Sequence, residues 1–179
     1  AGDLDSDWGP LTEEAVVQFE RLADEIAAAV ATFDARSENN LRTLAIRAQW
    51  PAREFLRRVR AAGIGARIIS GTRTYAMQDA LYRRGRFGNP GPRVTNARGG
   101  QSNHNFGIAW DIGIFTAAGG YLTGGPAYDD AAAAGLGGTQ LPMNAMAVFG
   151  GGNVRTGLED NPYLDYATRT PATNSALVR

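Results

Sequence analysis

The sequence predicts an α+β fold, in which N-terminal helices pack on a small antiparallel sheet. Apolar residues recur with a helical period through the first third of the chain, and short β-rich runs replace that period after Gly65. With 179 residues, 44% of them hydrophobic and 20% charged, the chain is long enough for one core and has the composition of a globular domain. We therefore expect the helices first and the sheet second.

Three helices are expected before the sheet. The first spans 12–33, with Thr12 as its N-cap. Its apolar stripe consists of Val16, Phe19, Leu22, Ile26, Val30 and Phe33. A second helix is expected after Ser37, and a third from Pro51, because proline suits the first helical turn. The basic residues of the third helix are expected to form a solvated face: Arg53, Arg57, Arg58 and Arg60.

The remaining elements are short. The run ARIIS (66–70) predicts a strand, and FGIAWDIGIF (106–115) predicts the best-defined strand of the chain. A short helix is expected between them, with Thr74 as its cap and Gly85 at its end. Residues 86–105 are rich in glycine, proline and asparagine and predict a long loop. Loops of this length within a compact domain are usually functional or disordered.

Composition excludes several classes of partner and site. The formal net charge is zero, so no global field draws the protein to nucleic acid. The chain has no cysteine, so a transition-metal site must use histidine, carboxylate or phenolate ligands. No apolar run approaches the ~20 residues of a membrane span. The first ten residues are acidic and unlike a signal peptide, so we expect either a signal already removed or another export route.

One histidine and one strand aspartate stand out. His104 is the only histidine in the chain, and Asp111 follows it by seven positions within an apolar strand. A carboxylate buried in such a strand costs several kcal/mol, on the order of an unpaired buried charge, unless a cation, an arginine or a metal offsets it. Spacing alone leaves two interpretations open. The two residues are either two ligands of one metal site, or a loop histidine and a strand aspartate that are not connected.

Two motifs carry a resemblance to a known family. SNHNFGIAWD (102–111) fits the pattern S-x-H-x-x-G-x-A-x-D, and SGTRTYAMQDALYRRGR (70–86) fits S-G-x-R-[ST]-x-x-x-Q-x-x-L-Y. Over about residues 36–115 the chain resembles the zinc D-Ala-D-Ala carboxypeptidase and L-alanyl-D-glutamate endopeptidase family. That family includes the vancomycin-resistance-type D,D-peptidases and many phage endolysins. The resemblance implies that the sheet carries a zinc site.

The resemblance also implies roles for individual residues. His104 and Asp111 match two zinc ligands, and Arg73 matches the arginine that stabilises the oxyanion of the tetrahedral intermediate. Ser102 and Gln78 match positions that line the substrate cleft, although loop and helix hydrogen bonding would explain them equally well.

The third part of the implied site lies near the C-terminus and departs from the family pattern. Asp160, or Glu159 beside it, matches the catalytic acid, whereas Tyr163 occupies the position of the third ligand histidine. Three explanations stay open: Tyr163 ligates zinc as a phenolate, Asp165 substitutes for it, or the metal and catalysis have been lost.

The function that the resemblance implies is a zinc metallopeptidase, a hydrolase that cuts the peptidoglycan stem peptide as a carboxypeptidase or endopeptidase. It would work outside the cytoplasm, in the periplasm, the cell wall or a phage particle. The alternative is a catalytically inactive wall-binding or structural module of a phage tail, injection device or secretion assembly. We expect a linker or docking helix at 1–35, a peptidase-like domain at 36–170 and a tail at 171–179.

Overall fold

The α+β fold predicted from the sequence is confirmed. The computed structural model describes residues 8–136, together with the backbone of 146–149, 152–154, 164–165 and 170–171. In chain order the elements are α1 (Pro10–Val30), α2 (Ala35–Leu41), α3 (Ile46–Ala61), β1 (Ala66–Ser70), α4 (Tyr75–Arg83), the short 3-10 helix η1 (Asn103–Phe106), β2 (Ala109–Phe115), β3 (Tyr121–Leu122), α5 (Pro126–Leu136), β4 (Met146–Phe149), β5 (Gly152–Val154), β6 (Leu164–Asp165) and β7 (Thr170–Pro171).

The main sheet is antiparallel on one side of β2 and mixed on the other. β1 and β3 both pair with β2 in the antiparallel sense, with Ile68 opposite Ile112. β4 runs parallel to β2, and β5 returns antiparallel to β4. The prediction of an antiparallel sheet is therefore confirmed for β1, β2 and β3 and wrong for β4. The register is irregular between Ile68 and Ser70, which brings Ser70 opposite Asp111.

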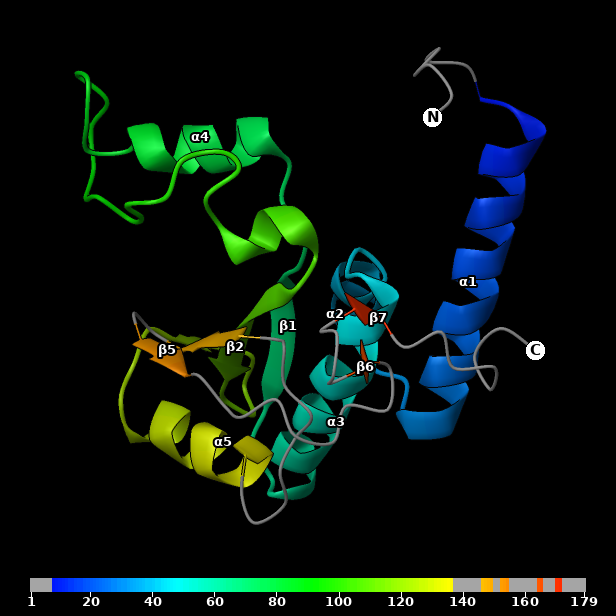
Figure 1. The fold of residues 1–179 in the computed structure, drawn as a ribbon. Helices are drawn as coiled ribbons and strands as arrows, with labels where there is room; N and C mark the ends of the chain where they lie inside the picture. Colours follow the sequence, from blue (N-terminus) through cyan, green and yellow to red (C-terminus); the bar gives the residue numbers. More distant parts are fainter. Residues whose placement is uncertain (1–7, 137–145, 150–151, 155–163, 166–169, 172–179) are drawn as a thin grey trace.

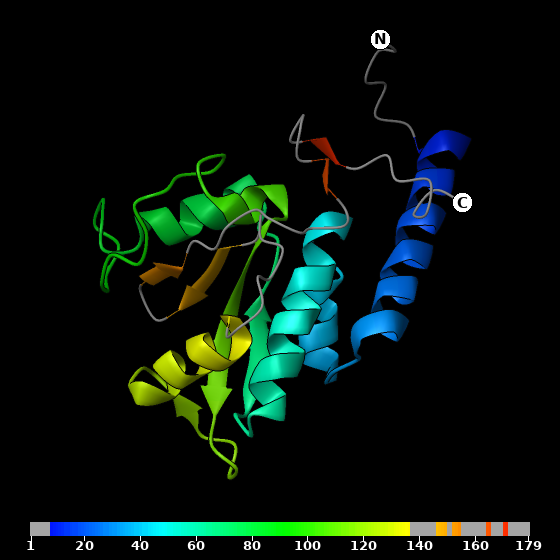
Figure 2. The same cartoon turned by 60° about the horizontal axis from the view of Figure 1, so that its bottom comes forward.

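Helices cover one face of this sheet and leave the site on the other. α3 lies between α1 and the sheet, and α5 lies beside α3 (Figures 1 and 2). Trp110, Ile112 and Ile114 of β2 are buried in the core that α3 and α5 share. Because side chains alternate along a strand, Asp111 points to the opposite face. This alternation places a carboxylate where no core helix covers it.

The apolar stripe of α1 is only partly used. Ala23, Ile26 and Ala27 are buried, whereas the first half of the helix is exposed and Val17 retains 60% of its accessible surface. The predicted boundary at residue 35 stays a prediction. None of the helices among the described residues combines the length and hydrophobicity needed to cross a lipid bilayer.

α3 begins five residues earlier than the sequence predicted, and its arginines do not all face solvent. Pro51 lies inside the helix, whose start is held by the Ala45 N–H donating to the carbonyl of Gly107 at 3.0 Å. Arg53 is fully buried and makes a bidentate ion pair with Glu38, at 2.7 and 2.8 Å. The predicted solvated face was therefore wrong for Arg53, because Glu38 of α2 supplies the compensating charge.

The loop between α4 and η1 is held against the body of the domain. The Nε2 of Gln78 donates to the carbonyl of Ala97 at 3.0 Å, and a carboxylate oxygen of Asp79 accepts from the Gly99 N–H at 2.8 Å. Arg86 adds a hydrogen bond of 2.9 Å to the carbonyl of Thr95. Of the two interpretations of this loop, these contacts favour the functional one, since the loop forms a wall of the cavity described next.

Candidate metal and substrate site

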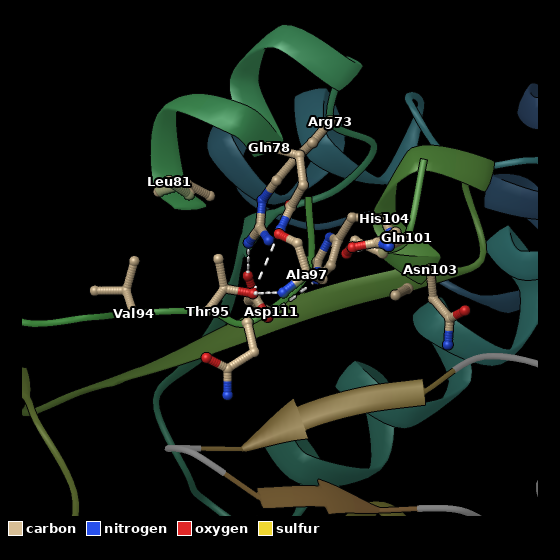
Figure 3. Close-up of a pocket in the computed structure, with 13 residues that line it drawn as sticks. Arg73, Gln78, Leu81, Val94, Thr95, Ala97, Gln101, Asn103, His104 and Asp111 are labelled. Carbon is tan, nitrogen blue, oxygen red and sulfur yellow. Dashed lines mark hydrogen bonds and ion pairs between the residues drawn. The ribbon is translucent and has the colours of Figure 1, made fainter. Parts of the chain in front are cut away.

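A cavity of about 580 Å³ lies above the outer face of β2, between α4, the loop that follows it and η1 (Figure 3). It brings together five of the residues that the sequence singled out. Its lining consists of Arg73, Gln78, Leu81, Val94, Thr95, Asn96, Ala97, Gln101, Ser102, Asn103, His104, Ala109 and Asp111. Most of its lining is polar or charged, and the apolar part of the wall comes from Leu81, Val94, Ala97 and Ala109.

His104 is held in one orientation by the backbone. The Ser102 side chain caps η1, and His104 within that turn is only 4% exposed. Nδ1 of His104 lies 2.7 Å from the carbonyl oxygen of Gly71. A carbonyl can only accept, so Nδ1 carries a proton and donates it, while Nε2 faces the carboxylate of Asp111. Position 71 requires glycine for its own packing, because a Cβ there would lie 2.4 Å from the carbonyl oxygen of Asn40.

Asp111 meets two partners in the cavity. Its Oδ1 lies 3.4 Å from Nε2 of His104, and its Oδ2 accepts from the guanidinium of Arg73. Burial alone raises the pKa of this carboxyl, but the hydrogen bonds and charges of His104 and Arg73 outweigh burial and hold the pKa below its usual value. Asp111 is therefore a carboxylate at neutral pH, and the partner predicted for it from its strand position is confirmed.

Arg73 is fixed at both its backbone and its side chain. Its N–H donates to the carbonyl of His104 at 3.0 Å, and its Nε donates to Oγ of Ser70 at 3.1 Å. A guanidinium carries five N–H donors, more than the contacts to Ser70 and Asp111 use. Arg73 thus holds a fixed positive charge in the cavity, directly beside Asp111.

The histidine and aspartate pair fits one edge of a metal site. Nε2 of His104 and Oδ1 of Asp111 face each other at 3.4 Å, so either a proton or a metal ion can lie between them. A metal-bound histidine typically donates its other N–H to a carbonyl, as Nδ1 does to Gly71. Imidazole nitrogen and carboxylate oxygen are both ordinary ligands of zinc.

The described residues do not complete a ligand set. No group of three or more His, Cys, Asp or Glu side chains that could hold a metal occurs in this part of the chain. The remaining predicted site residues, Glu159, Asp160 and Tyr163, lie outside the described residues. β4 pairs with β2 so that Val148 stands opposite Asp111, which returns the C-terminal part of the chain to the strand that carries the site.

Two further predicted residues line the cavity. Gln78 is almost fully buried, and within the described residues its Oε1 has no hydrogen-bond partner. Nε2 of Gln78 faces the carbonyl of Ala97, which fixes Oε1 as the free atom of the amide. Ser102 lines the cavity beside His104. The sequence did not single out Asn105, and its position directly after His104 is the one signal that could have found it. The side chain of Asn105 contacts the segment that carries Arg73.

Comparison with known proteins identifies a family. A family model described as BKACE, beta-keto acid cleavage enzyme, matches residues 10–179. The chain belongs to the beta-keto acid cleavage enzyme family. The match takes in both halves of the fold, including α1 and the C-terminal strands. Enzymes of this family are metal-dependent, commonly on zinc, which is compatible with the zinc predicted from the sequence.

This assignment overturns the family and the reaction predicted from the sequence. The resemblance to zinc D,D-carboxypeptidases and L-alanyl-D-glutamate endopeptidases rested on two motifs between residues 70 and 111, whereas the beta-keto acid cleavage model matches 10–179. The predictions of a peptidoglycan metallopeptidase, hydrolase or endolysin are accordingly corrected. The partners, the location outside the cytoplasm and the roles of individual site residues stay predictions.

A short segment of the chain is similar to a curated protein that carries out a different reaction, the hydrolysis of peptidoglycan peptides. The peptidoglycan L-alanyl-D-glutamate endopeptidase CwlK of Bacillus subtilis (strain 168) is 46% identical over 52 residues, which make up 29% of this chain and 30% of CwlK. The chain thus matches less than a third of that relative. The two comparisons disagree about the reaction. A histidine, a carboxylate and an arginine suit any metal-assisted reaction that develops an oxyanion, so the assignment rests on the family match and not on the cavity.

Proposed function

We propose that this protein is a metal-dependent enzyme that cleaves a β-keto acid in the cavity above β2. The family match supplies the reaction class. The arrangement of Arg73, His104 and Asp111 supports this cavity as the site of the reaction. It brings a guanidinium, an imidazole nitrogen and a carboxylate together on one face of the sheet. A β-keto acid offers complementary groups, because its carboxylate and its ketone oxygen both favour positive partners.

His104 and Asp111 would hold the metal, and zinc is the ion that we propose. Nδ1 of His104 keeps its proton on Gly71, so Nε2 stays available as a ligand. A bound zinc ion would polarise a carbonyl oxygen as a Lewis acid. The C-terminal segment that contains Glu159, Asp160 and Tyr163 is the proposed source of the remaining ligand, since β4 leads the chain back to Asp111.

Arg73 would stabilise the charge that cleavage creates. Cleavage between the α- and β-carbons of a β-keto acid begins when a nucleophile such as water adds to the ketone carbon. That carbon then leaves as a carboxylic acid, and the electron pair left on the α-carbon delocalises onto an oxygen as an enolate, which takes up a proton. A guanidinium fixed beside that oxygen stabilises it without having to reorganise. Burial of Arg73 strengthens the effect, because its side chain keeps only 18% of its accessible surface.

Gln78 would take part in binding the substrate. A buried acceptor without a partner costs about 1–3 kcal/mol, and a ligand that donates a hydrogen bond removes that cost. Oε1 of Gln78 is such an acceptor within the described part of the cavity wall. Ser102 lines the same cavity and is proposed as a second polar contact.

The proposal is tested by turnover. Zinc-loaded protein is mixed with acetoacetate as a short β-keto acid, and the substrate is followed by proton NMR against metal-free protein and Asp111→Asn. We expect consumption of the keto acid that requires zinc and is lost in Asp111→Asn. No consumption by the zinc-loaded protein, across a series of β-keto acids of increasing length, would overturn the proposal.

A further inference from the structure

Two segments that are distant in sequence build the charged centre of the cavity. One is the turn after β1 that carries Arg73, and the other is η1, which carries His104. The backbones of the two segments meet where the N–H of Arg73 donates to the carbonyl of His104, at 3.0 Å. A single side chain adds to this contact: Nδ2 of Asn105 donates to the carbonyl of Arg73 at 2.8 Å and to that of Thr74 at 3.3 Å.

The other end of the Asn105 amide holds the segment before η1. Its Oδ1 accepts from the N–H of Gly100 at 2.9 Å and from the N–H of Ser102 at 3.4 Å. The partners fix which atom is which, because carbonyls require the NH₂ side of the amide and N–H groups require its oxygen. Asn105 therefore uses both ends of its amide, one end on its own turn and the other on the segment that carries Arg73.

We propose that Asn105 is a positioning residue that sets the guanidinium of Arg73 against Asp111. The main chain of Arg73 is held on both sides, by the His104 carbonyl at its N–H and by Asn105 at its carbonyl. With its backbone held there, the side chain extends to Ser70 and Asp111 in one direction. A displacement of about 1 Å at a reacting centre can cost about a hundredfold in rate, which gives such a tie a measurable effect.

A purely local role for Asn105 is the competing explanation. Asn105 forms a capping box with Ser102 at the start of η1, and such a cap stabilises the turn by itself. The cap uses Oδ1, whereas the link to Arg73 uses Nδ2. Asn105→Asp separates the two roles, because the carboxylate keeps an acceptor for the cap and puts an oxygen against the carbonyl of Arg73.

A matched control exists elsewhere in the fold. Nδ2 of Asn40 donates to the carbonyls of Arg36 and Ile68 and so links α2 to β1, on residues that do not line the cavity. Asn40→Asp makes the same chemical change to a similar bridge. Comparison of the two variants separates a general loss of protein stability from a loss of the correct position of Arg73.

The first measurement is independent of the proposed function. The Nε–H signal of Arg73 is observed by ¹⁵N–¹H NMR and assigned by its disappearance in Arg73→Lys. We expect Asn105→Asp to shift or broaden this signal, and Asn40→Asp to leave it in place. An unchanged signal in folded Asn105→Asp would overturn the inference. If Asn105→Asp does not fold, Asn105→Ala, which introduces no charge, decides by the same signal.

The second measurement rests on the proposed function and uses turnover. We expect Asn105→Asp to lower kcat/KM by about ten- to a hundredfold, as loss of an outer-shell partner commonly does. In protein that already carries Arg73→Lys, Asn105→Asp should lower kcat/KM little further. Asn105 acts through the guanidinium of Arg73, and that group is absent from this protein. Losses that multiply in the double variant would overturn the inference. A protein without keto acid turnover would contradict the proposed function alone, since the NMR result stands by itself.

Discussion

Nε2 of His104 and Oδ1 of Asp111 lie 3.4 Å apart, while Nδ1 of His104 donates to the carbonyl of Gly71. An imidazole nitrogen and a carboxylate oxygen are thus directed at each other on the wall of a cavity, with Arg73 beside them. Such a pair can share a proton or bind a cation. The metal site that we propose at this pair does not depend on which substrate the metal serves.

The first prediction concerns the metal content. Protein stripped with a chelator and reloaded should hold about one zinc ion per chain, and His104→Ala and Asp111→Ala should hold almost none, because each removes a ligand. Elemental analysis after gel filtration measures the content. Asp130→Ala, on the exposed surface of α5, is the matched control and should bind as the wild type does. Stoichiometric zinc in His104→Ala would show that the pair is not the metal site.

The second prediction concerns Arg73. Arg73→Lys should lower kcat by about a hundredfold with zinc content unchanged, because an ammonium cannot reproduce the planar fork that reaches both Asp111 and the developing oxyanion. Steady-state kinetics with the keto acid and elemental analysis on the same sample measure both quantities. Arg57→Lys, at a half-exposed position of α3, serves as the control. A kcat equal to that of the wild type would make Arg73 a structural residue.

The third prediction concerns the glycine that orients the histidine. A Cβ on Gly71 would lie 2.3 Å from Oγ1 of Thr43 and 2.4 Å from the carbonyl of Asn40, so Gly71→Ala must displace the backbone. That backbone carries the carbonyl that holds His104. We expect the free energy of unfolding to fall by about 2 kcal/mol and the zinc dissociation constant to rise about tenfold.

A control for Gly71→Ala is available in a loop. A Cβ on Gly124 meets nothing within 4 Å, so Gly124→Ala tests the effect of a methyl group without a clash. Chemical denaturation and zinc titration of the two variants give the comparison. If Gly71→Ala bound zinc as tightly as Gly124→Ala, orientation of His104 by Gly71 would not contribute to metal binding.

Local patterns predicted much of the fold. The strand run at 66–70 matches β1. The strand predicted at 106–115 begins later, at Ala109, because Phe106 still belongs to η1 and Gly107 caps that turn in the left-handed conformation. The position of Asp111 inside an apolar strand predicted that its carboxylate needs a charged partner, and Arg73 is that partner. What the sequence could not show were long-range contacts: the hydrogen bond from Ala45 to Gly107 that starts α3 early, and the Glu38 carboxylate that allows Arg53 to be buried.

The C-terminal third was the least predictable part of the chain. α5 was missed, because an alanine- and glycine-rich run has no clear apolar period and the helix takes its stability from packing on α3. Gly135 fits there only because it lacks a side chain, since a Cβ would lie 2.1 Å from the ring of Phe55. The site residues at 70–111 were found from two motifs that resemble those of a known family. The motifs did not reveal the reaction, because the same ligands serve many substrates.

The fourth prediction concerns the stability of the helical layer in acid. Burial raises the pKa of Glu38, but the hydrogen bonds from Arg53 and from the Phe33 N–H outweigh it and leave the pKa below the ordinary value of 4.5. The folded state therefore binds fewer protons than the unfolded state, and this contribution to stability is present above about pH 4.5 and lost as the pH falls through the folded pKa. Glu38→Gln should remove that part of the acid dependence.

The same variant should also be less stable at neutral pH. Glu38→Gln leaves the buried Arg53 guanidinium without its counter-charge, and we expect the free energy of unfolding at pH 7 to fall by about 3 kcal/mol. Urea denaturation between pH 3 and 7 gives both results, with Glu13→Gln on the exposed start of α1 as the control. Equal acid dependence in Glu38→Gln and the wild type would show that the ion pair does not govern acid stability.

Offering the zinc-loaded protein two kinds of substrate in parallel decides whether it is a keto acid enzyme. A series of β-keto acids is followed by proton NMR, purified peptidoglycan is followed by release of soluble peptides, and each reaction is repeated with metal-free protein and with Asp111→Asn. The account predicts zinc-dependent consumption of a keto acid that Asp111→Asn abolishes, and no release from peptidoglycan. Zinc-dependent release of peptides, with every keto acid left intact, would contradict the account and restore the reaction named by the local similarity to CwlK.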